Sequence, residues 1–170
     1  MPAQKLYTGR LVLAPYGWQD AAELAAFRAD PRVWAMMLGG VRTPAQSAAD
    51  LAAEIAFWGA HGIGMWTARD LDGVLLGVTG LHERPDARGI ALRYAFDPAV
   101  RGNGLAREAA GAALRDAHER AGLTRVVAVT RETNFSSRKV LGGIGMVEAG
   151  GFNQYGHAML LYESIRPRLG

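Results

Sequence analysis

The stretch that decides the fold reads Tyr94-Ala-Phe-Asp-Pro-Ala-Val-Arg101-Gly-Asn-Gly104-Leu-Ala-Arg107. A strand-like run enters a turn with two glycines, and that turn opens a long apolar-striped segment. The first turn of a helix leaves backbone N–H groups unpaired, and the helix dipole adds partial positive charge there. Glycine lets the main chain approach a ligand closely. The pattern therefore favours an anion site, suited to phosphate, with Arg101 and Arg107 adding charge.

Other readings of this turn stay open on the residues alone. A plain strand-to-helix turn with incidental glycines is as compatible with them as a phosphate site. A Walker loop needs Gly-Lys-Ser/Thr, whereas Gly104 is followed by Leu105 and Ala106. A dinucleotide fingerprint needs a third glycine where Arg107 stands. Other nucleotides are thus weaker ligand candidates.

Hydrophobic spacing extends the pattern outward from the turn. Apolar residues from Leu105 to Ala121 form one helical stripe, with Asp116–Arg120 and Arg115–Glu119 as i, i+4 pairs on the other face. Ile90–Phe96 precedes this helix as a strand, and the buried-looking Val126–Val129 strand follows it. Together they predict a right-handed βαβ unit with parallel strands.

The remaining elements are marked by caps and turn residues. We predict strands at Leu6–Ala14, Met65–Arg69, Val74–Leu81 and Met159–Ile165, and helices beginning at Asp20, at the Thr43/Gln46 capping box and at Asn134. Asp72-Gly73 is a hairpin turn signal between the second and third of these strands. A loop over residues 83–89 precedes the next strand. The fold class is therefore α/β with a mixed sheet and helices on its faces, in one domain over residues 1–170.

Composition narrows the classes of function. The chain of 170 residues has a net charge of +3 and no cysteine, which excludes disulfides and a thiol nucleophile and favours a cytoplasmic setting. No two of the four histidines have a helical i, i+4 spacing, so we expect no metal. Without a basic run, a long apolar run or a signal-like N-terminus, we expect neither nucleic acid nor membrane as a partner.

Several motifs resemble one family. Arg101-Gly-Asn-Gly104-Leu-Ala106 matches the R/Q-x-x-G-x-G/A motif of the GNAT acetyltransferases. Asn134-Phe-Ser-Ser137 is similar to the family's N-x-x-S/A signature, and Gly145-Met146 resembles its closing Gly-Phe. The resemblance runs from Leu6 to the last strand and is closest to the branch of ribosomal-protein N-terminal acetyltransferases. It implies a mostly antiparallel sheet with a parallel βαβ unit.

The resemblance also implies roles for particular residues. The cofactor would be acetyl-CoA, and Ser137 would lie near its sulfur and act as the acid. The cofactor-binding residues would be Arg101 and the amides of Gly102, Asn103, Gly104, Leu105, Ala106 and Arg107 at the pyrophosphate, the backbone of Tyr94, Ala95 and Phe96 along the pantetheine arm, and the Asn134 side chain. Arg138 or Lys139 would reach a phosphate. Asn134 and Ser137 also fit a plain helix cap and a polar helix residue.

Two catalytic residues that are frequent in the family are absent from this sequence. The positions of the family's strand glutamate hold Ala91 and Arg93, and that of its tyrosine holds Leu141. We favour Glu83 as the base, although an exposed loop carboxylate without a catalytic role explains this residue equally well. The other candidates for the base are His82, Tyr155 and His157. The loop over residues 150–157 is shorter than in the ribosomal branch, which puts a ribosomal substrate in doubt.

The expected function is transfer of an acetyl group to a primary amine, on a protein N-terminus or a small molecule, by a monomer or homodimer. The alternative is a non-catalytic acyl-CoA-binding or regulatory module on the same fold. We expect the large apolar side chains outside the motifs to be core rather than an acceptor pocket, namely Trp34, Met36, Met37, Trp58 and Trp66.

Overall fold

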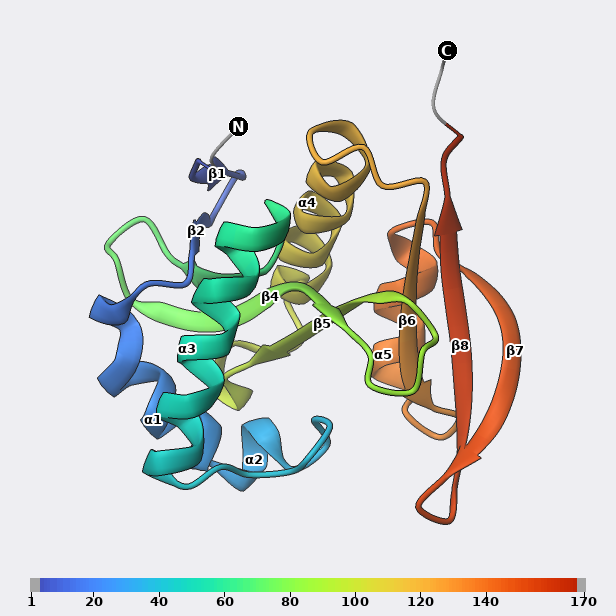
Figure 1. Ribbon diagram of the computed structural model, residues 1–170, viewed down its shortest axis with the longest axis horizontal. Helices are drawn as coiled ribbons and strands as arrows, with labels where there is room; N and C mark the ends of the chain where they lie inside the picture. The colour runs from blue at the N-terminus through green and yellow to red at the C-terminus, as the bar shows by residue number, and fades with distance from the viewer. Residues whose placement is uncertain (1–3, 168–170) are drawn as a thin grey trace.

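A computed structural model describes residues 4–167 of the chain. Eight strands form one sheet in the order β1-β2-β3-β4-β5-β6-β8-β7, and β5–β6 is its parallel pair (Figure 1). The strands are β1 Leu6–Tyr7, β2 Val12–Pro15, β3 Met65–Arg69, β4 Leu75–Glu83, β5 Ile90–Phe96, β6 Arg125–Arg131, β7 Val147–Gln154 and β8 His157–Ile165. The mixed sheet predicted from the sequence is confirmed, with β5, α4 and β6 as its βαβ unit.

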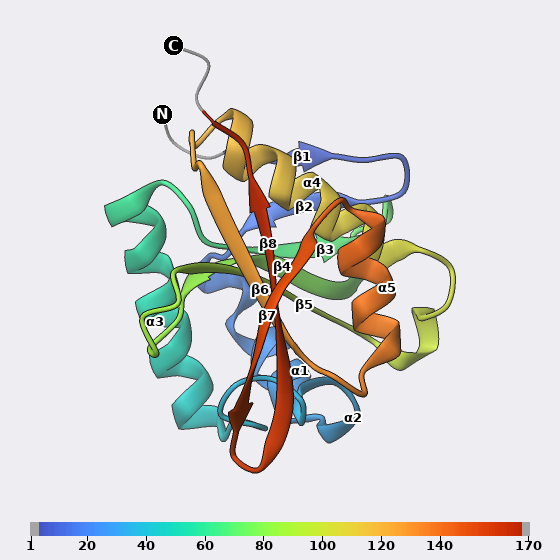
Figure 2. The ribbon, with the colours of Figure 1, turned by 90° about the vertical axis from the view of Figure 1, so that its right-hand side faces the viewer.

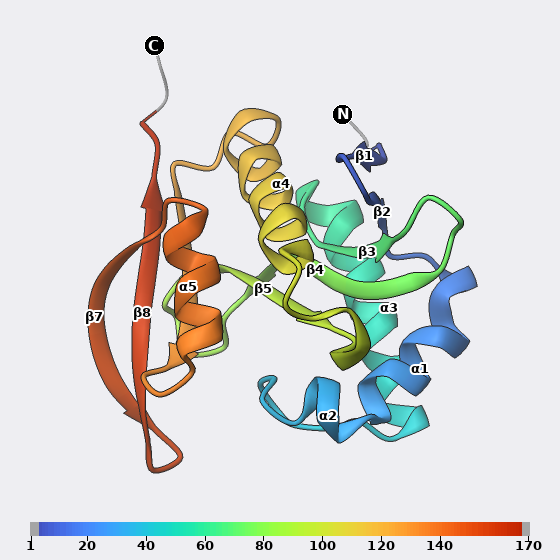
Figure 3. The ribbon, with the colours of Figure 1, turned by 180° about the vertical axis from the view of Figure 1, so that it is seen from behind.

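Helices cover both faces of this sheet. The helices are α1 Ala21–Ala29, α2 Pro31–Trp34, α3 Pro44–His61, α4 Leu105–Glu119 and α5 Phe135–Gly143, with 3-10 turns at Trp18–Asp20 and Pro98–Val100. Figure 2, which looks at the β7 end of the sheet, shows α3 and α5 on opposite sides of the strands. Figure 3 shows α4 and α5 on the face opposite to that seen in Figure 1.

Each face has its own core. The buried stripe of α4, from Leu105 to Ala117, packs with Leu92 and Phe96 of β5 and with Leu141 of α5. On the other face, Leu24, Trp34 and Leu51 of α1, α2 and α3 pack on the opposite side of β3, β4 and β5. Side chains alternate between the faces of a strand, so β5 sends successive residues to the two cores.

Caps and glycines set the helix limits largely as the sequence predicts. Thr43 and Gln46 form the expected capping box of α3, and Gly62 ends this helix in the left-handed region, at φ 67°. Helix α4 ends at Glu119 rather than Ala121. Asp116 pairs with Arg120 at 2.8 Å, but Glu119 lies 3.8 Å from Arg166, so the expected Arg115–Glu119 pair is wrong.

The N-terminal expectations need two corrections. Leu6–Ala14 is not one strand, because the chain turns at Thr8, whose N–H donates to the Leu11 carbonyl at 2.9 Å; β1 and β2 then pair antiparallel. Asp20 does not cap α1 with its side chain. Its carboxylate instead accepts the Gly17 N–H at 2.9 Å and pairs with Arg69, which draws it back into the preceding turn.

Strand ends also differ from the prediction. β4 continues through His82 to Glu83, because both residues pair in register with β5, so Glu83 ends a strand instead of beginning a loop. Residues 150–154 belong to β7, which pairs with β8, so the expected loop is reduced to a tight turn at Tyr155 and Gly156. Among the large apolar residues expected in the core, Trp34 and Trp66 are buried, whereas Met36 is exposed.

Candidate active site

The two parallel strands of the sheet separate almost as soon as they meet. β5 and β6 pair at a single position, Ala91 with Val127. Beyond it, β5 keeps its ladder with β4 through Phe96, while β6 keeps its ladder with β8 through Arg131. Figures 1 and 3 show the two strands diverging from this point. We call residues 92–96 of β5 and 128–131 of β6 the fork.

The β5 side of the fork carries unpaired backbone groups. The Asp97 N–H donates to the Leu76 carbonyl of the β4 side at 2.9 Å. Residues of an antiparallel ladder alternate in the side to which they point their backbone groups. Ala95 therefore faces β4, and Tyr94 and Phe96 present theirs to the fork. This arrangement suits an extended ligand with amide groups, which would add to the sheet as a strand does.

The glycine turn begins where the fork is widest. Gly102 and Gly104 adopt φ 89° and 83°, in the left-handed region that favours glycine. Gly104 is the N-cap of α4, and its carbonyl accepts the Glu108 N–H at 3.0 Å. The N–H groups of Leu105, Ala106 and Arg107 precede the first helical hydrogen bond and have no intrahelical partner. Such unpaired N–H groups at a glycine-capped helix N-terminus are the kind of place where proteins bind anions.

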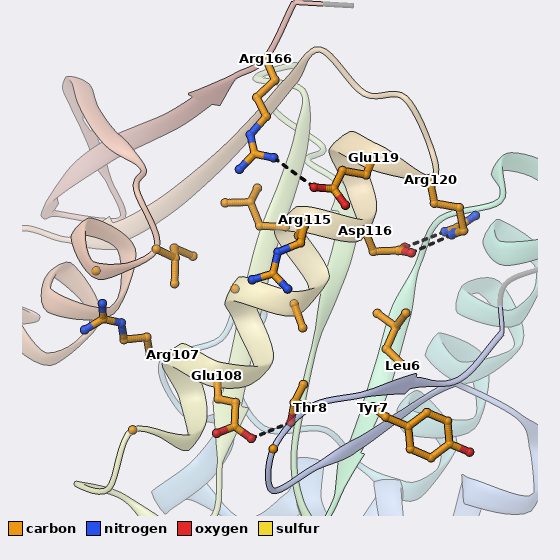
Figure 4. Close-up of a pocket in the computed structure, with 17 residues that line it drawn as sticks. Leu6, Tyr7, Thr8, Arg107, Glu108, Arg115, Asp116, Glu119, Arg120 and Arg166 are labelled. Atoms are coloured by element: carbon orange, nitrogen blue, oxygen red, sulfur yellow. Dashed lines mark hydrogen bonds and ion pairs between the residues drawn. The ribbon is translucent and has the colours of Figure 1, made fainter.

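The two arginines of the motif have different surroundings. Arg101 donates from Nε to the Phe96 carbonyl at 3.1 Å and from Nη2 to the Arg32 carbonyl at 2.8 Å. Its side chain therefore ties the turn to β5 and to α2, and it satisfies one backbone group that we expected to meet the pantetheine arm. Arg107 extends from α4 toward α5, where its Nε lies beside Gly143 (Figure 4).

Ser137 lies against Tyr94 across the fork. Its Oγ is 2.7 Å from the Tyr94 hydroxyl, which also lies 3.2 Å from the Ser137 carbonyl. Burial raises the pKa of Tyr94 to about 12, so its phenol stays protonated near neutral pH. The sequence pointed to Tyr94 only through its backbone. Its side chain was missed because 43 residues separate it from Ser137.

Asn134 caps α5. Its Oδ1 accepts the Ser137 N–H at 3.2 Å, which leaves its amide N–H groups to donate elsewhere. Arg138 does not turn toward the glycine loop; it donates to the Glu132 carbonyl and the Tyr162 hydroxyl and lies over the Phe135 ring. Leu141, at the position of the family's tyrosine, is buried in the α4 core.

The base candidates are spread over two places. Glu83 is exposed and pairs with Ile90, next to the closed end of the fork. His82 faces the α3 side, where burial and the nearby Arg93 and Arg84 lower its pKa to about 3. Tyr155 and His157 are exposed at the β7–β8 turn.

A charged cluster on the α3 side escaped sequence reasoning. Glu54 of α3 accepts from Arg28 of α1 at 2.8 Å and from Arg93 of β5 at 3.3 Å. Burial raises the pKa of Glu54, although both arginines oppose the shift. The cluster borders a cavity of about 240 Å³. Its lining residues are Arg28, Trp34, Leu38, Arg42, Asp50, Ala53, Glu54 and Arg93.

A larger groove, of about 840 Å³, runs along the outer side of α4 (Figure 4). It meets the glycine turn at Gly104 and Arg107. Most of its charges are satisfied locally, as Glu108 binds Thr8, Asp116 binds Arg120 and Glu119 binds Arg166. Because the groove lacks the fork's backbone edge, we place the candidate active site at the fork and turn.

Comparison with known proteins agrees with this geometry. The profile of the acetyltransferase (GNAT) domain matches residues 10–147. A GNAT-family acetyltransferase from Bordetella pertussis is 28% identical, with 95% of this chain and 99% of that chain covered and a TM-score of 0.84.

Two solved ribosomal-protein acetyltransferases share the fold at lower identity. One is the ribosomal-protein-S5-alanine acetyltransferase of Vibrio fischeri, at 18% identity and a TM-score of 0.80 over 96% of this chain and 97% of that one. The other is the ribosomal L7/L12 α-N-protein acetyltransferase RimL in complex with coenzyme A, at 15% identity and a TM-score of 0.80 over 95% and 98%. The chain therefore belongs to the GNAT family, and it is an acetyl-CoA-dependent acyltransferase.

Proposed function

We propose that this protein transfers the acetyl group of acetyl-CoA to a primary amine. The observation that carries the proposal is continuity: the unpaired edge of β5 leads straight into the glycine-capped N-terminus of α4. An amide-containing arm fits along the first, and a pyrophosphate fits at the second. The two features lie in the order that one extended ligand requires.

The residues of the chain divide the binding between them. The backbone groups of Tyr94 and the Phe96 N–H hydrogen-bond the pantetheine arm, and the Phe96 carbonyl is held by Arg101. The amides from Gly102 to Arg107 bind the pyrophosphate, and an N–H of Asn134 donates to the arm. Acetyl-CoA supplies the acetyl group as a thioester, which is reactive toward a neutral amine.

Transfer requires one bond to form and one to break. The amine nitrogen attacks the thioester carbon, the C–N bond forms and the C–S bond breaks. The neutral amine loses one proton and the departing sulfur gains one, so the products are the amide and the free thiol. Ser137 gives its proton to the sulfur, and the proton lost by the amine nitrogen returns to the Ser137 oxygen through solvent. We propose that the Tyr94 hydroxyl, which lies 2.7 Å from Ser137 Oγ and 3.2 Å from the Ser137 carbonyl, donates to Oγ in this step and so leaves the serine proton free to point at the sulfur.

The amine must reach the site without its extra proton. An α-amino group has a pKa of about 7.7 to 8.0 and a lysine amine about 10.4, so a base matters more for lysine-like acceptors. We propose Glu83 for this role. Its partner Ile90 lies four positions before Tyr94 along β5, a span of about 13 Å, so Glu83 acts through water rather than by contact.

The wider setting is also proposed. The whole chain acts as one catalytic domain, in the cytoplasm, as a monomer or homodimer, and the absence of cysteine supports that compartment. The acceptor is a small amine or a peptide N-terminus. Within residues 4–167, no helix has the length and apolar character that a bilayer crossing needs.

Thiol release from acetyl-CoA tests the proposal, across a panel of amino acids, polyamines, other amines and peptides. We expect release with at least one class, together with CoA binding by calorimetry that exceeds binding of ATP or NAD. Tight CoA binding without turnover on the whole panel would instead support the non-catalytic module, as the absent strand glutamate and the buried Leu141 suggest. Preference for ATP or NAD would contradict both.

A further inference from the structure

The cavity on the α3 side meets the fork at Arg93. Arg93 lines this cavity and directly precedes Tyr94 in β5. Successive side chains of a strand point to opposite faces, so Arg93 meets the cavity while Tyr94 meets Ser137. A molecule held by Arg93 therefore lies across β5 from the hydroxyl pair that we place at the sulfur.

The charges around the cavity are unevenly matched. Three guanidinium groups and two carboxylates line it, which leaves an excess of one positive charge. Arg42 binds Asp50 with two hydrogen bonds of 2.8 and 3.1 Å. Arg28 is buried, donates to Glu54 at 2.8 Å and also contacts the Ser47 carbonyl.

Arg93 makes the longest hydrogen bonds of the three. Its contacts are one with Glu54 at 3.3 Å and one from Nε to the Met65 sulfur at 3.5 Å. Within residues 4–167 each of the three guanidinium groups uses two of its five N–H donors, and the bonds of Arg93 are the weakest, because one is long and the other is to sulfur. Its side chain is 22% exposed, which leaves it accessible from the cavity. The planar guanidinium group suits a carboxylate, which accepts two parallel hydrogen bonds from it.

We propose that this cavity is the acceptor pocket, and that it takes a small amine that also carries a carboxylate, bound by Arg93. The inference rests on the proposed function. The 240 Å³ volume is below the usual range of about 300 to 1,000 Å³ for drug-sized ligands, so the occupant has the size of an amino acid. Polyamines carry only positive charge, which the excess positive charge of the cavity repels. A peptide N-terminus has no carboxylate beside its amine.

The test compares acceptors that differ only in charge. A panel of α- and ω-amino acids is assayed for thiol release beside the primary amide of each. We expect the acids to exceed their amides about tenfold to a hundredfold in kcat/KM, as the loss of a charged hydrogen bond implies. Arg93→Gln should abolish this preference. Arg93→Lys keeps the positive charge but not the planar guanidinium group, so it should retain part of the preference.

Two controls separate the possible failures. Arg115→Gln, on the groove side of α4, should keep the preference for acids. CoA affinity, measured by calorimetry, should stay within about twofold in Arg93→Gln, because Arg93 is on the face away from Ser137. A thermal melt confirms that the Arg93 variants fold.

The remaining outcomes have distinct meanings. Amides or cationic amines that match the acids, or an acid preference that survives Arg93→Gln, would overturn the acceptor inference and leave the proposed function standing. CoA binding without thiol release from any acceptor would overturn the proposed function, and the acceptor inference with it.

Discussion

The two sides of β5 are built from different kinds of information. On the α4 and α5 side, the site consists of a backbone edge, a glycine turn and a helix N-terminus, and few of its interactions need charged side chains. On the α3 side, a buried arginine, a glutamate and a strand arginine come from three separate elements. The backbone edge, turn and helix N-terminus of the first side come from one contiguous stretch of sequence. The residues of the second side come together only when the chain folds.

The largest effect should follow a change on the contiguous side. Gly104→Glu should reduce CoA affinity by more than about a hundredfold, because the new carboxylate occupies the phosphate position and repels it. The residue has φ 83°, so the variant also bears backbone strain of about 1 to 2 kcal/mol. Calorimetry with CoA measures the affinity.

Gly156→Glu is the matched control. Gly156 has φ 78° at the β7–β8 turn, with open space around it, so it shares the strain but lies outside the loop. Both variants should lose similar stability, and only Gly104→Glu should lose CoA binding. Retained CoA affinity in a folded Gly104→Glu protein would show that the loop assignment is wrong.

The charged side should respond in stability first. Glu54→Ala leaves the Arg28 guanidinium buried, with Asp50 3.9 Å away as its remaining acidic neighbour. Breaking a buried ion pair typically costs about 3 to 5 kcal/mol, and we expect a loss of this size in the free energy of unfolding. Urea denaturation measures it.

Glu23→Ala provides the comparison for that loss. Glu23 also pairs with an arginine at 2.8 Å, but its side chain is 52% exposed. Exposed pairs are worth about 0 to 1 kcal/mol, so its removal should be nearly silent. Equal effects of the two substitutions would mean that the Arg28–Glu54 pair is no more than a surface contact.

Kinetics sharpens the role of Ser137. Ser137→Ala should lower kcat about tenfold to a hundredfold and leave KM for acetyl-CoA nearly unchanged, because a thiol with a pKa of about 8.5 departs with only modest help. A binding role would raise KM instead. Tyr94→Phe should lower kcat too, and the double variant should lose less than the two losses combined. Unchanged kcat in Ser137→Ala, with chemistry rate-limiting, would remove Ser137 from the mechanism.

The smallest expected effect is a pH dependence of stability. His82 has a folded pKa of about 3, below its unfolded value of 6.5, so the unfolded chain binds a proton first as the pH falls. Stability should therefore decline below pH 6.5, by at most about 1.4 kcal/mol per pH unit from this residue. Denaturation of His82→Gln between pH 7 and 5 should show a flatter slope than wild type. The exposed His157→Gln is the control, and an unchanged slope in His82→Gln would contradict the assignment.

The comparison also explains how far sequence reasoning reached. Residues 94–107 predicted the strand, the turn and the helix because each step depends on neighbours in the chain. The Thr43 capping box and the Gly62 stop were local in the same way. Asp20 was wrongly predicted to cap a helix, because its carboxylate accepts the Gly17 N–H and pairs with Arg69, 49 residues away.

Contacts between distant segments account for the rest. The Tyr94–Ser137 hydroxyl pair and the Arg28–Glu54–Arg93 cluster join residues that no periodicity connects. Glu54 gave no signal, because a glutamate on a helix is ordinarily solvated. The end of β4 was missed because His82 and Glu83 are polar, although the ladder with β5 continues through both.

Amide hydrogen exchange with and without CoA tests the central claim most directly. If the cofactor lies along the fork and its pyrophosphate at the turn, CoA should slow exchange at Tyr94, at Phe96 and at residues 102–107. Exchange along the exposed strand β7 should not change. Protection of the outer groove of α4, at residues such as Gly111 and Arg115, without protection of Tyr94 and Phe96, would contradict the account.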